Sequence, residues 1–212
     1  MIRADKIWRK IYASLLHNLD VTKHGYFSYT GYKYQTSHKG LDDFSLWEKY
    51  DDTLMQDVLS FELKMPFKCD DLSDSEHNNH KLINHDFYQN AYFNFVVETH
   101  FDNDTIFLTE KTFKPILNLQ PFVIVGNPGS LQLLKSLGYK TFDHVLDNSY
   151  DTIDNNTQRW RCLSQSIAAA QRRLPELFAQ AVPDILHNQQ LFTSSKKSRL
   201  NTLLTQINDQ YN

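Results

Sequence analysis

The chain has 212 residues, and its 22 Lys and Arg stand against 25 Asp and Glu, so its formal net charge is −3. That balance gives no electrostatic case for nucleic acid or an anionic membrane as the main partner, while 41% apolar residues are enough for the core of one medium domain. Two distant cysteines without a CxxC pair indicate neither a disulfide framework nor a zinc site, and no apolar run approaches the ~20 residues of a membrane span. Because charges interrupt the apolar residues at the N-terminus, unlike those of a signal peptide, we expect a cytoplasmic protein.

The first part of the chain is predicted to begin with one regular helix. Residues 5–19 place Ile7, Ile11 and Leu15 on one apolar stripe, which is the pattern of an amphipathic helix. The segments that follow are less regular. We expect a strand-like stretch over 26–34, short helices around 46–47 and 55–63, and a polar insertion over about 68–86.

Residues 92–138 are the most informative part of the chain and predict a βαβα unit. Two runs, 93–97 and 121–125, have the apolar, β-branched and aromatic composition of buried strands. Between them Thr109 is placed as the N-cap of a helix, and the second run leads through a glycine-containing turn into another helix. Ligands of open α/β sheets bind at the carboxyl ends of strands, beside helix N-termini. The residues at such ends are Glu98, Thr109, Glu110, Lys111 and Gly126.

The C-terminal part is predicted to be mainly helical. An Asp- and Asn-rich loop is expected over 141–156 and a helix over 157–174, with Pro175 in the first turn of its successor. Pro183 is expected to interrupt the chain again before a final amphipathic helix over 196–207. The predicted fold is α/β, a Rossmann-like parallel sheet flanked by helices. It has one domain over 1–175 and a helical C-terminal segment over 176–212.

Glu110 and Lys111 carry chemistry that suits a nucleotide. At the first turn of a helix, the ammonium of Lys111 adds to free backbone N–H groups and the positive dipole end, and together these suit a phosphate. The carboxylate of Glu110 can accept hydrogen bonds from ribose hydroxyls. In the alternative interpretation, Glu110 only stabilises the helix dipole and Lys111 is a solvated lysine. The motif is so short that both interpretations stay open.

Glu98 and Gly126 end the two predicted strands. A charged group that ends an apolar strand is either a structural partner or a ligand contact. The turn from Gly126 to Gly129 allows a ligand to approach the backbone closely, but it has neither GxGxxG nor a Walker-type lysine. A plain turn and a binding loop therefore both stay open.

Taken together, these blocks resemble the donor-binding lobe of family 10 glycosyltransferases, the α1,3/4-fucosyltransferases. That family has a strand ending in Phe-Glu-Asn, a Tyr-Val-Thr-Glu-Lys loop, a Pro-led strand running into glycine, and an Arg-led first helix. The stretches TEKTFKPI and LGYKTFDHVLDNSYD look closer still to small bacterial and phage-encoded relatives. The resemblance covers about residues 3–175, and its counterparts here are Val97-Glu98-Thr99, Phe107 to Lys111, Pro121 to Gly126, and Trp8 to Tyr12.

The resemblance implies a two-lobed, GT-B-type enzyme that transfers a sugar from a nucleotide-sugar donor to a glycan hydroxyl. In the family the sugar is fucose from GDP-fucose, configuration is inverted, and no metal or cofactor is needed. Arg9 and Lys111 would hold the diphosphate and Glu110 the ribose hydroxyls, with Thr109 and Gly126 in the same donor-binding set. Glu98, a candidate catalytic residue, would sit near the transferred sugar or brace the pocket. Two fixed cations can neutralise the charge of the departing nucleoside diphosphate.

The chain departs from the family in ways that affect the donor and the catalytic base. Phe107 stands where the family has tyrosine and Thr99 where it has asparagine, so the identity of the donor is in question. Arg9 aligns near the start of the family's second lobe, so we expect the first lobe, which supplies acceptor contacts and the general base, to be absent. The alternatives are a non-catalytic nucleotide or nucleotide-sugar binding module that needs a partner lobe, and an α/β domain whose donor pocket has decayed.

A relocated base is expected in the loops at the carboxyl edge of the sheet. The candidates are Asp147, Asp151, His100 and His144. Each has a structural alternative, since aspartates often cap turns and helices and histidines often lie hydrogen-bonded at the surface. An HxxH spacing in a polar segment without a rigid scaffold gives no firm metal site. The histidines concerned are His77, His80 and His85.

Overall fold

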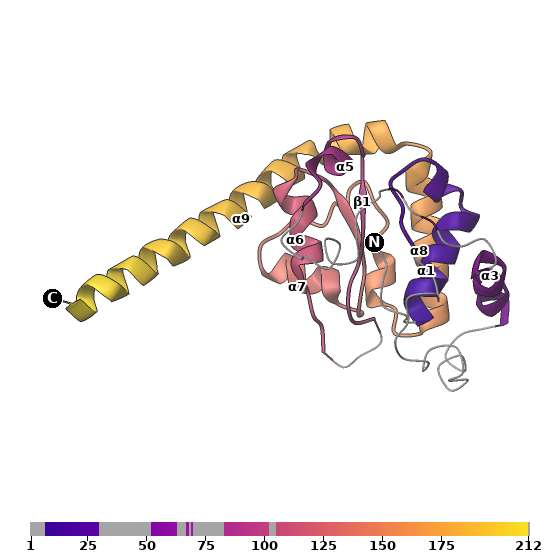
Figure 1. The fold of residues 1–212 in the computed structure, drawn as a ribbon, viewed down its shortest axis with the longest axis horizontal. Helices are drawn as coiled ribbons and strands as arrows, with labels where there is room; N and C mark the ends of the chain where they lie inside the picture. The colour runs from indigo at the N-terminus through magenta and orange to yellow at the C-terminus, as the bar shows by residue number, and fades with distance from the viewer. Residues whose placement is uncertain are drawn as a thin grey trace.

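The computed structural model describes residues 7–29, 52–62, 67, 69, 83–101 and 105–211, and leaves aside the side chains of 62, 196, 197 and 199–211. The expected helix around 46–47, most of the polar insertion and residues 30–34 of the strand-like stretch lie outside the described residues. Within them the fold is mixed α/β, with helices on both sides of a two-stranded parallel sheet (Figure 1).

The first helix forms as its apolar stripe predicts. Helix α1 runs from Ile7 to Asn18 and buries Ile11, Tyr12 and Leu16 against the rest of the molecule. The 3-10 turn η1 (Val21–Lys23) follows it. Helix α3 (Asp52–Glu62) packs on α1 through Val58 and Phe61. Residues 26–29 are the described part of the predicted strand-like stretch. Within them, Tyr29 forms an isolated antiparallel bridge with Phe67.

The sheet consists of β1 (Asn94–Val97) and β2 (Phe122–Val125), paired parallel in the register Asn94 with Phe122 and Val97 with Val125. All four residues of β2 are buried, as expected for a strand covered on both faces. Before the sheet, the short helix α5 (His85–Gln89) is tied to it by Gln120, whose Nε2 donates to the carbonyl oxygens of Tyr88 and Ala91, at 2.6 Å each.

Helix α6 (Glu110–Leu117) connects the two strands and contacts both of them. Thr109 is its N-cap, as predicted, because the Thr109 hydroxyl accepts a hydrogen bond from the Lys111 amide at 3.3 Å. Helix α7 (Ser130–Ser136) follows β2 and lies beside α6 in Figure 1. These elements confirm the predicted βαβα order.

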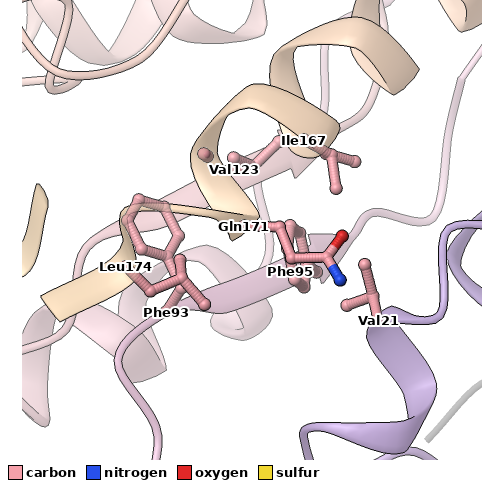
Figure 2. Close-up of a pocket in the computed structure, with 8 residues that line it drawn as sticks. Val21, Phe93, Phe95, Val123, Ile167, Gln171 and Leu174 are labelled. Carbon is pink, nitrogen blue, oxygen red and sulfur yellow. The ribbon is translucent and has the colours of Figure 1, made fainter.

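The other face of the sheet is covered by α1 and α8. Helix α8 (Asn156–Gln171) follows the short turn η3 (Ser149–Thr152) and buries Trp160, Leu163 and Ile167. Tyr12 of α1 packs edge-on against Phe95 of β1, with the ring centroids 6.4 Å apart. Near the beginning of the strands this packing leaves a small apolar pocket (Figure 2). It is lined by Val21, Phe93, Phe95, Val123, Ile167, Ala170, Gln171 and Leu174.

Helix α9 is longer than the sequence suggests. It runs from Leu174 to Tyr211 without a break at Pro183, so the helix predicted over 196–207 is the distal part of a single helix. Leu177, Ala181 and Ile185 are buried at a spacing of four residues, and this stripe continues across the proline. Burial of the stripe therefore offsets the hydrogen bond that Pro183 removes. Beyond this buried part the helix extends away from the body of the molecule (Figure 1).

Candidate functional site

The end of β1 is organised around the buried carboxylate of Glu98, which is 1% exposed. One of its oxygens accepts hydrogen bonds from the Thr109 amide at 2.9 Å and the Thr112 hydroxyl at 2.6 Å, and the other accepts from the Thr109 hydroxyl at 2.7 Å. Glu98 thus ties the end of β1 to the first turn of α6. Its side chain therefore supports the site from the protein interior and does not line an open surface.

Lys111 lies on the solvent side of these hydrogen bonds, and its side chain is 35% exposed. Its ammonium donates to the hydroxyls of Thr99, at 3.2 Å, and Thr109, at 3.3 Å. The carboxylate of Glu110 is 3.8 Å away and 44% exposed. The cation is therefore anchored at the edge of the sheet, beside an accessible carboxylate.

Arg9 reaches the same strand end from α1. Its guanidinium Nη2 donates to the backbone oxygen of Glu98 across 3.5 Å, and the residue is 8% exposed. Burial lowers the pKa of Arg9, and the nearby carboxylate of Glu98 opposes that change. Arg9 and Lys111 are 102 positions apart in the chain, yet both contact the Glu98–Thr99 segment. The structure therefore places both cations that the sequence singled out in contact with one strand end.

Gly126 closes the site from β2 and is buried. A Cβ atom at this position would lie 3.0 Å from the Ser130 hydroxyl oxygen and 3.5 Å from the Cβ of Glu98. The absence of a side chain at residue 126 thus leaves room for the Ser130 hydroxyl, whereas the distance to Glu98 would be an ordinary van der Waals contact. The following turn is fixed by Asn127, whose side-chain amide donates to the Thr105 carbonyl at 2.7 Å.

Phe107 is an exposed aromatic residue of the segment that leads into α6. Its side chain is 52% exposed and meets the His100 ring edge-on, with the centroids 5.7 Å apart. His100 follows Thr99 in sequence, and Phe107 precedes Thr109 by two positions, so this pair belongs to the two segments that hold the ammonium. An aromatic edge next to a cation suits a ligand that has both a ring and a charged group.

The two candidate aspartates make structural contacts. Asp151 is buried, and its carboxylate accepts hydrogen bonds from the Leu131 and Gln132 amides at 3.0–3.1 Å, so it caps α7. Burial raises the pKa of Asp151, while these two amides act in the opposite direction. Asp147 is exposed and accepts a hydrogen bond from the Ser149 amide at 3.0 Å. Hydrogen bonding to the Ser149 side chain, and then to this amide, lowers the pKa of Asp147.

The histidines singled out in the sequence are dispersed. His144 lies 3.4 Å from the Asp184 carboxylate on α9, and its other ring nitrogen is 3.2 Å from the Gln180 carbonyl oxygen. His85 lies 2.8 Å from the Asn118 side chain, and His77 and His80 are outside the described residues. Over the described ranges, no group of three or more His, Cys, Asp or Glu side chains is arranged to hold a metal ion.

Two further residues support the site, and sequence reasoning missed the first of them, Thr112. Thr112 is fully buried and donates to Glu98; its signal was the three-residue spacing from Thr109, typical of paired side chains at a helix start. Arg159 is also buried, donates to the Phe101 carbonyl at 2.6 Å, and lies 3.9 Å above the Phe101 ring. It supports the segment that follows β1 and is buried rather than solvated on the surface of α8.

Comparison of the chain with family models, with curated proteins and with solved structures finds no significant match. Within the part of the chain that the structure describes, none of the helices combines the length and apolar character that crossing a bilayer requires.

Proposed function

We propose that this chain binds a nucleoside-diphosphate sugar at the carboxyl end of β1, as the donor-binding lobe of a glycosyltransferase similar to the family 10 fucosyltransferases. The observation that carries the proposal is the convergence of the Arg9 guanidinium and the Lys111 ammonium on the Glu98–Thr99 segment. Two cations that contact one strand end suit a diphosphate, whose charge they can neutralise.

The neighbouring side chains suit the remaining parts of such a donor. The carboxylate of Glu110 is exposed next to Lys111, where it can accept hydrogen bonds from ribose hydroxyls. The Phe107 ring is exposed on the segment that leads into α6 and can cover an apolar face of the donor. The layers of helices about a parallel sheet are compatible with a Rossmann-like lobe of the GT-B type.

The proposed reaction is a direct displacement at the anomeric carbon. An acceptor hydroxyl oxygen forms the new bond to that carbon as the bond to the diphosphate oxygen breaks, and the hydroxyl proton passes to a base. The diphosphate leaves with the bonding electron pair, and Arg9 and Lys111 stabilise the charge that accumulates on it. Transfer of fucose, the glycan acceptor and the inverting outcome are parts of this proposal that come from the family resemblance.

A second candidate is a non-catalytic nucleotide-sugar module that acts with a partner lobe. This alternative is favoured by the state of the three candidate catalytic carboxylates. Glu98 and Asp151 are buried and accept hydrogen bonds from neighbouring segments, while Asp147 holds the Ser149 amide. A general base needs a lone pair within reach of the acceptor proton. A base from a partner lobe would meet that requirement.

Calorimetric titration with GDP-, UDP- and dTDP-sugars tests the binding site. One of these donors should bind, and Lys111→Ala should weaken its binding by roughly 1–3 kcal/mol because a charge-assisted contact to the diphosphate is lost. Lys135→Ala is the matched control. Lys135 is a surface lysine of α7, and its ammonium pairs with the Asp143 carboxylate. Equal affinities for the wild-type chain and Lys111→Ala would contradict the assignment of the diphosphate to Lys111.

Donor turnover separates the two candidate functions. Release of free nucleoside diphosphate by the isolated chain, alone or with a glycan acceptor, would support a complete enzyme. Tight donor binding without turnover, and turnover restored by an added lobe of the family, would support the module. Absence of binding to every donor in the panel would overturn both.

A further inference from the structure

The hydroxyl of Thr109 lies between the buried carboxylate and the accessible cation. Its Oγ1 is 2.7 Å from a Glu98 carboxylate oxygen, 3.3 Å from the Lys111 ammonium and 3.3 Å from the Lys111 amide. Thr109 itself is 9% exposed, so these contacts are largely shielded from water. The Thr109 side chain therefore links the buried Glu98 carboxylate to the Lys111 ammonium at the surface.

The direction of these hydrogen bonds follows from the chemistry of the partners. The amide and the ammonium of Lys111 are donors only, so the Thr109 oxygen must accept from both. A hydroxyl has one proton, and the carboxylate of Glu98 is the acceptor within reach of it. The proton of Thr109 therefore points at Glu98 and its lone pairs point at Lys111. This polarity aligns the hydroxyl dipole favourably with both charges.

The same contacts restrict the ammonium of Lys111. Two of its three protons are directed at the hydroxyls of Thr99 and Thr109. A lysine side chain otherwise keeps about 2 kcal/mol of rotamer entropy, part of which a ligand contact must offset. An ammonium already held by two hydroxyls has less of this freedom to lose when it meets a phosphate oxygen.

We propose that Thr109 is a positioning residue of the diphosphate site, a role that rests on the proposed function: its hydroxyl, oriented by Glu98, holds the Lys111 ammonium in place for the ligand. Thr109 does not touch the donor in this arrangement; it acts through Lys111. The N-cap of α6 thereby serves both the helix and the cation two residues further on.

Thr112 provides a matched comparison within the same network. Its hydroxyl donates to Glu98 at 2.6 Å, and among the described contacts of Lys111 it is not a partner. Thr109→Val and Thr112→Val each remove one hydroxyl donor to the same carboxylate. Only the first also removes the acceptor of the Lys111 ammonium and of the Lys111 amide, and Thr109→Ser restores both, so the cap of α6 and the contact to the ammonium return together.

Affinity for GDP and for inorganic pyrophosphate should be measured by calorimetry for these variants of the full chain. Thr109→Val should weaken binding by about 10-fold more than Thr112→Val, and Thr109→Ser should stay within about 3-fold of the wild-type chain. In a Lys111→Ala background, Thr109→Val should have little further effect, because the two residues act as one unit. Equal losses in the two valine variants, or a loss that persists without Lys111, would overturn the proposal.

A ligand-free measurement separates this role from the proposed function. The rate at which a small acylating reagent modifies the Lys111 amine, followed by peptide mass spectrometry, should change in Thr109→Val and remain near the wild-type rate in Thr112→Val and Thr109→Ser. If no nucleotide or pyrophosphate binds but this pattern holds, the proposed function fails and the positioning of Lys111 stands. If nucleotide binds and the amine reacts equally in all variants, the positioning role fails alone.

Discussion

Asp151 illustrates how burial and hydrogen bonding act in opposite directions on one carboxylate. Its side chain caps α7 through the Leu131 and Gln132 amides, yet burial raises its pKa above the ordinary value. In the pH window between the ordinary pKa, about 4, and the raised one, the folded chain retains a proton that the unfolded chain has released. The free energy of unfolding therefore falls as pH rises through this window.

Replacing Asp151 by asparagine should remove this pH dependence. The difference in unfolding free energy, Asp151→Asn minus wild type, should rise as pH increases through the window, which urea unfolding at a series of pH values would measure. Asp147→Asn is the control of opposite sign, because the Ser149 hydrogen bonds lower the pKa of Asp147. For that variant the difference should fall as pH rises towards the ordinary pKa. An Asp151→Asn difference that is flat or falls with pH would contradict the expectation.

At the scale of elements, β2 presents two valines on one face with different surroundings. Val123 lines the apolar pocket beside Phe93 and Ile167 (Figure 2), whereas Val125 lies at the other end of the strand, next to the candidate site, and does not line this pocket. Both are 1% exposed, and both belong to the same strand. A difference between substitutions at these positions therefore reports packing rather than strand propensity.

Val123→Ile should stabilise the fold and Val125→Ile should destabilise it. The extra methylene of the first can enter the pocket, for a gain of up to about 0.8 kcal/mol. The second adds volume at a buried position that does not line this pocket, where we expect overpacking at a cost of about 1–3 kcal/mol. Denaturant unfolding of both variants measures the two effects. Equal destabilisation by both would show that the pocket cannot accept the added group.

The elements of the βαβα unit could be predicted because their signals are local. The cap at Thr109 and the apolar composition of β2 depend on neighbouring residues, and the structure confirms both. The unbroken course of α9 through Pro183 could not be predicted this way. It depends on burial of Leu177, Ala181 and Ile185 against residues distant in sequence, and this burial outweighs the local effect of proline.

At the scale of the whole molecule, α9 joins a buried part to an extended one. Asn188 is 1% exposed and pairs with the backbone of Lys140, accepting from its amide at 2.7 Å and donating to its carbonyl at 2.8 Å. Phe192 packs against Phe113 of α6, with the ring centroids 5.6 Å apart. Beyond this point the helix leaves the body (Figure 1). Attachment of α9 therefore depends on its first half.

Removing the extended part should leave the stability of the body nearly unchanged. Truncation after Ser195 should alter the unfolding free energy by no more than about 0.5 kcal/mol. Asn188→Ala should cost about 1–3 kcal/mol, because both backbone groups of Lys140 lose their partner. Thermal and urea unfolding of the two variants measure these effects. A truncation more destabilising than Asn188→Ala would show that the distal half also supports the body.

Sequence alone determined the secondary structure around the candidate site, because caps, strand composition and turn glycines act over a few residues. The family resemblance also predicts that Arg9 and Lys111 hold one diphosphate and that Glu98 sits near the sugar or braces the pocket. Only the tertiary structure decided that Glu98 is buried and that Arg9 and Lys111 both contact the Glu98–Thr99 segment. Such convergence depends on how α1 packs on the sheet, and no pattern of neighbouring residues encodes the distance between segments 102 positions apart.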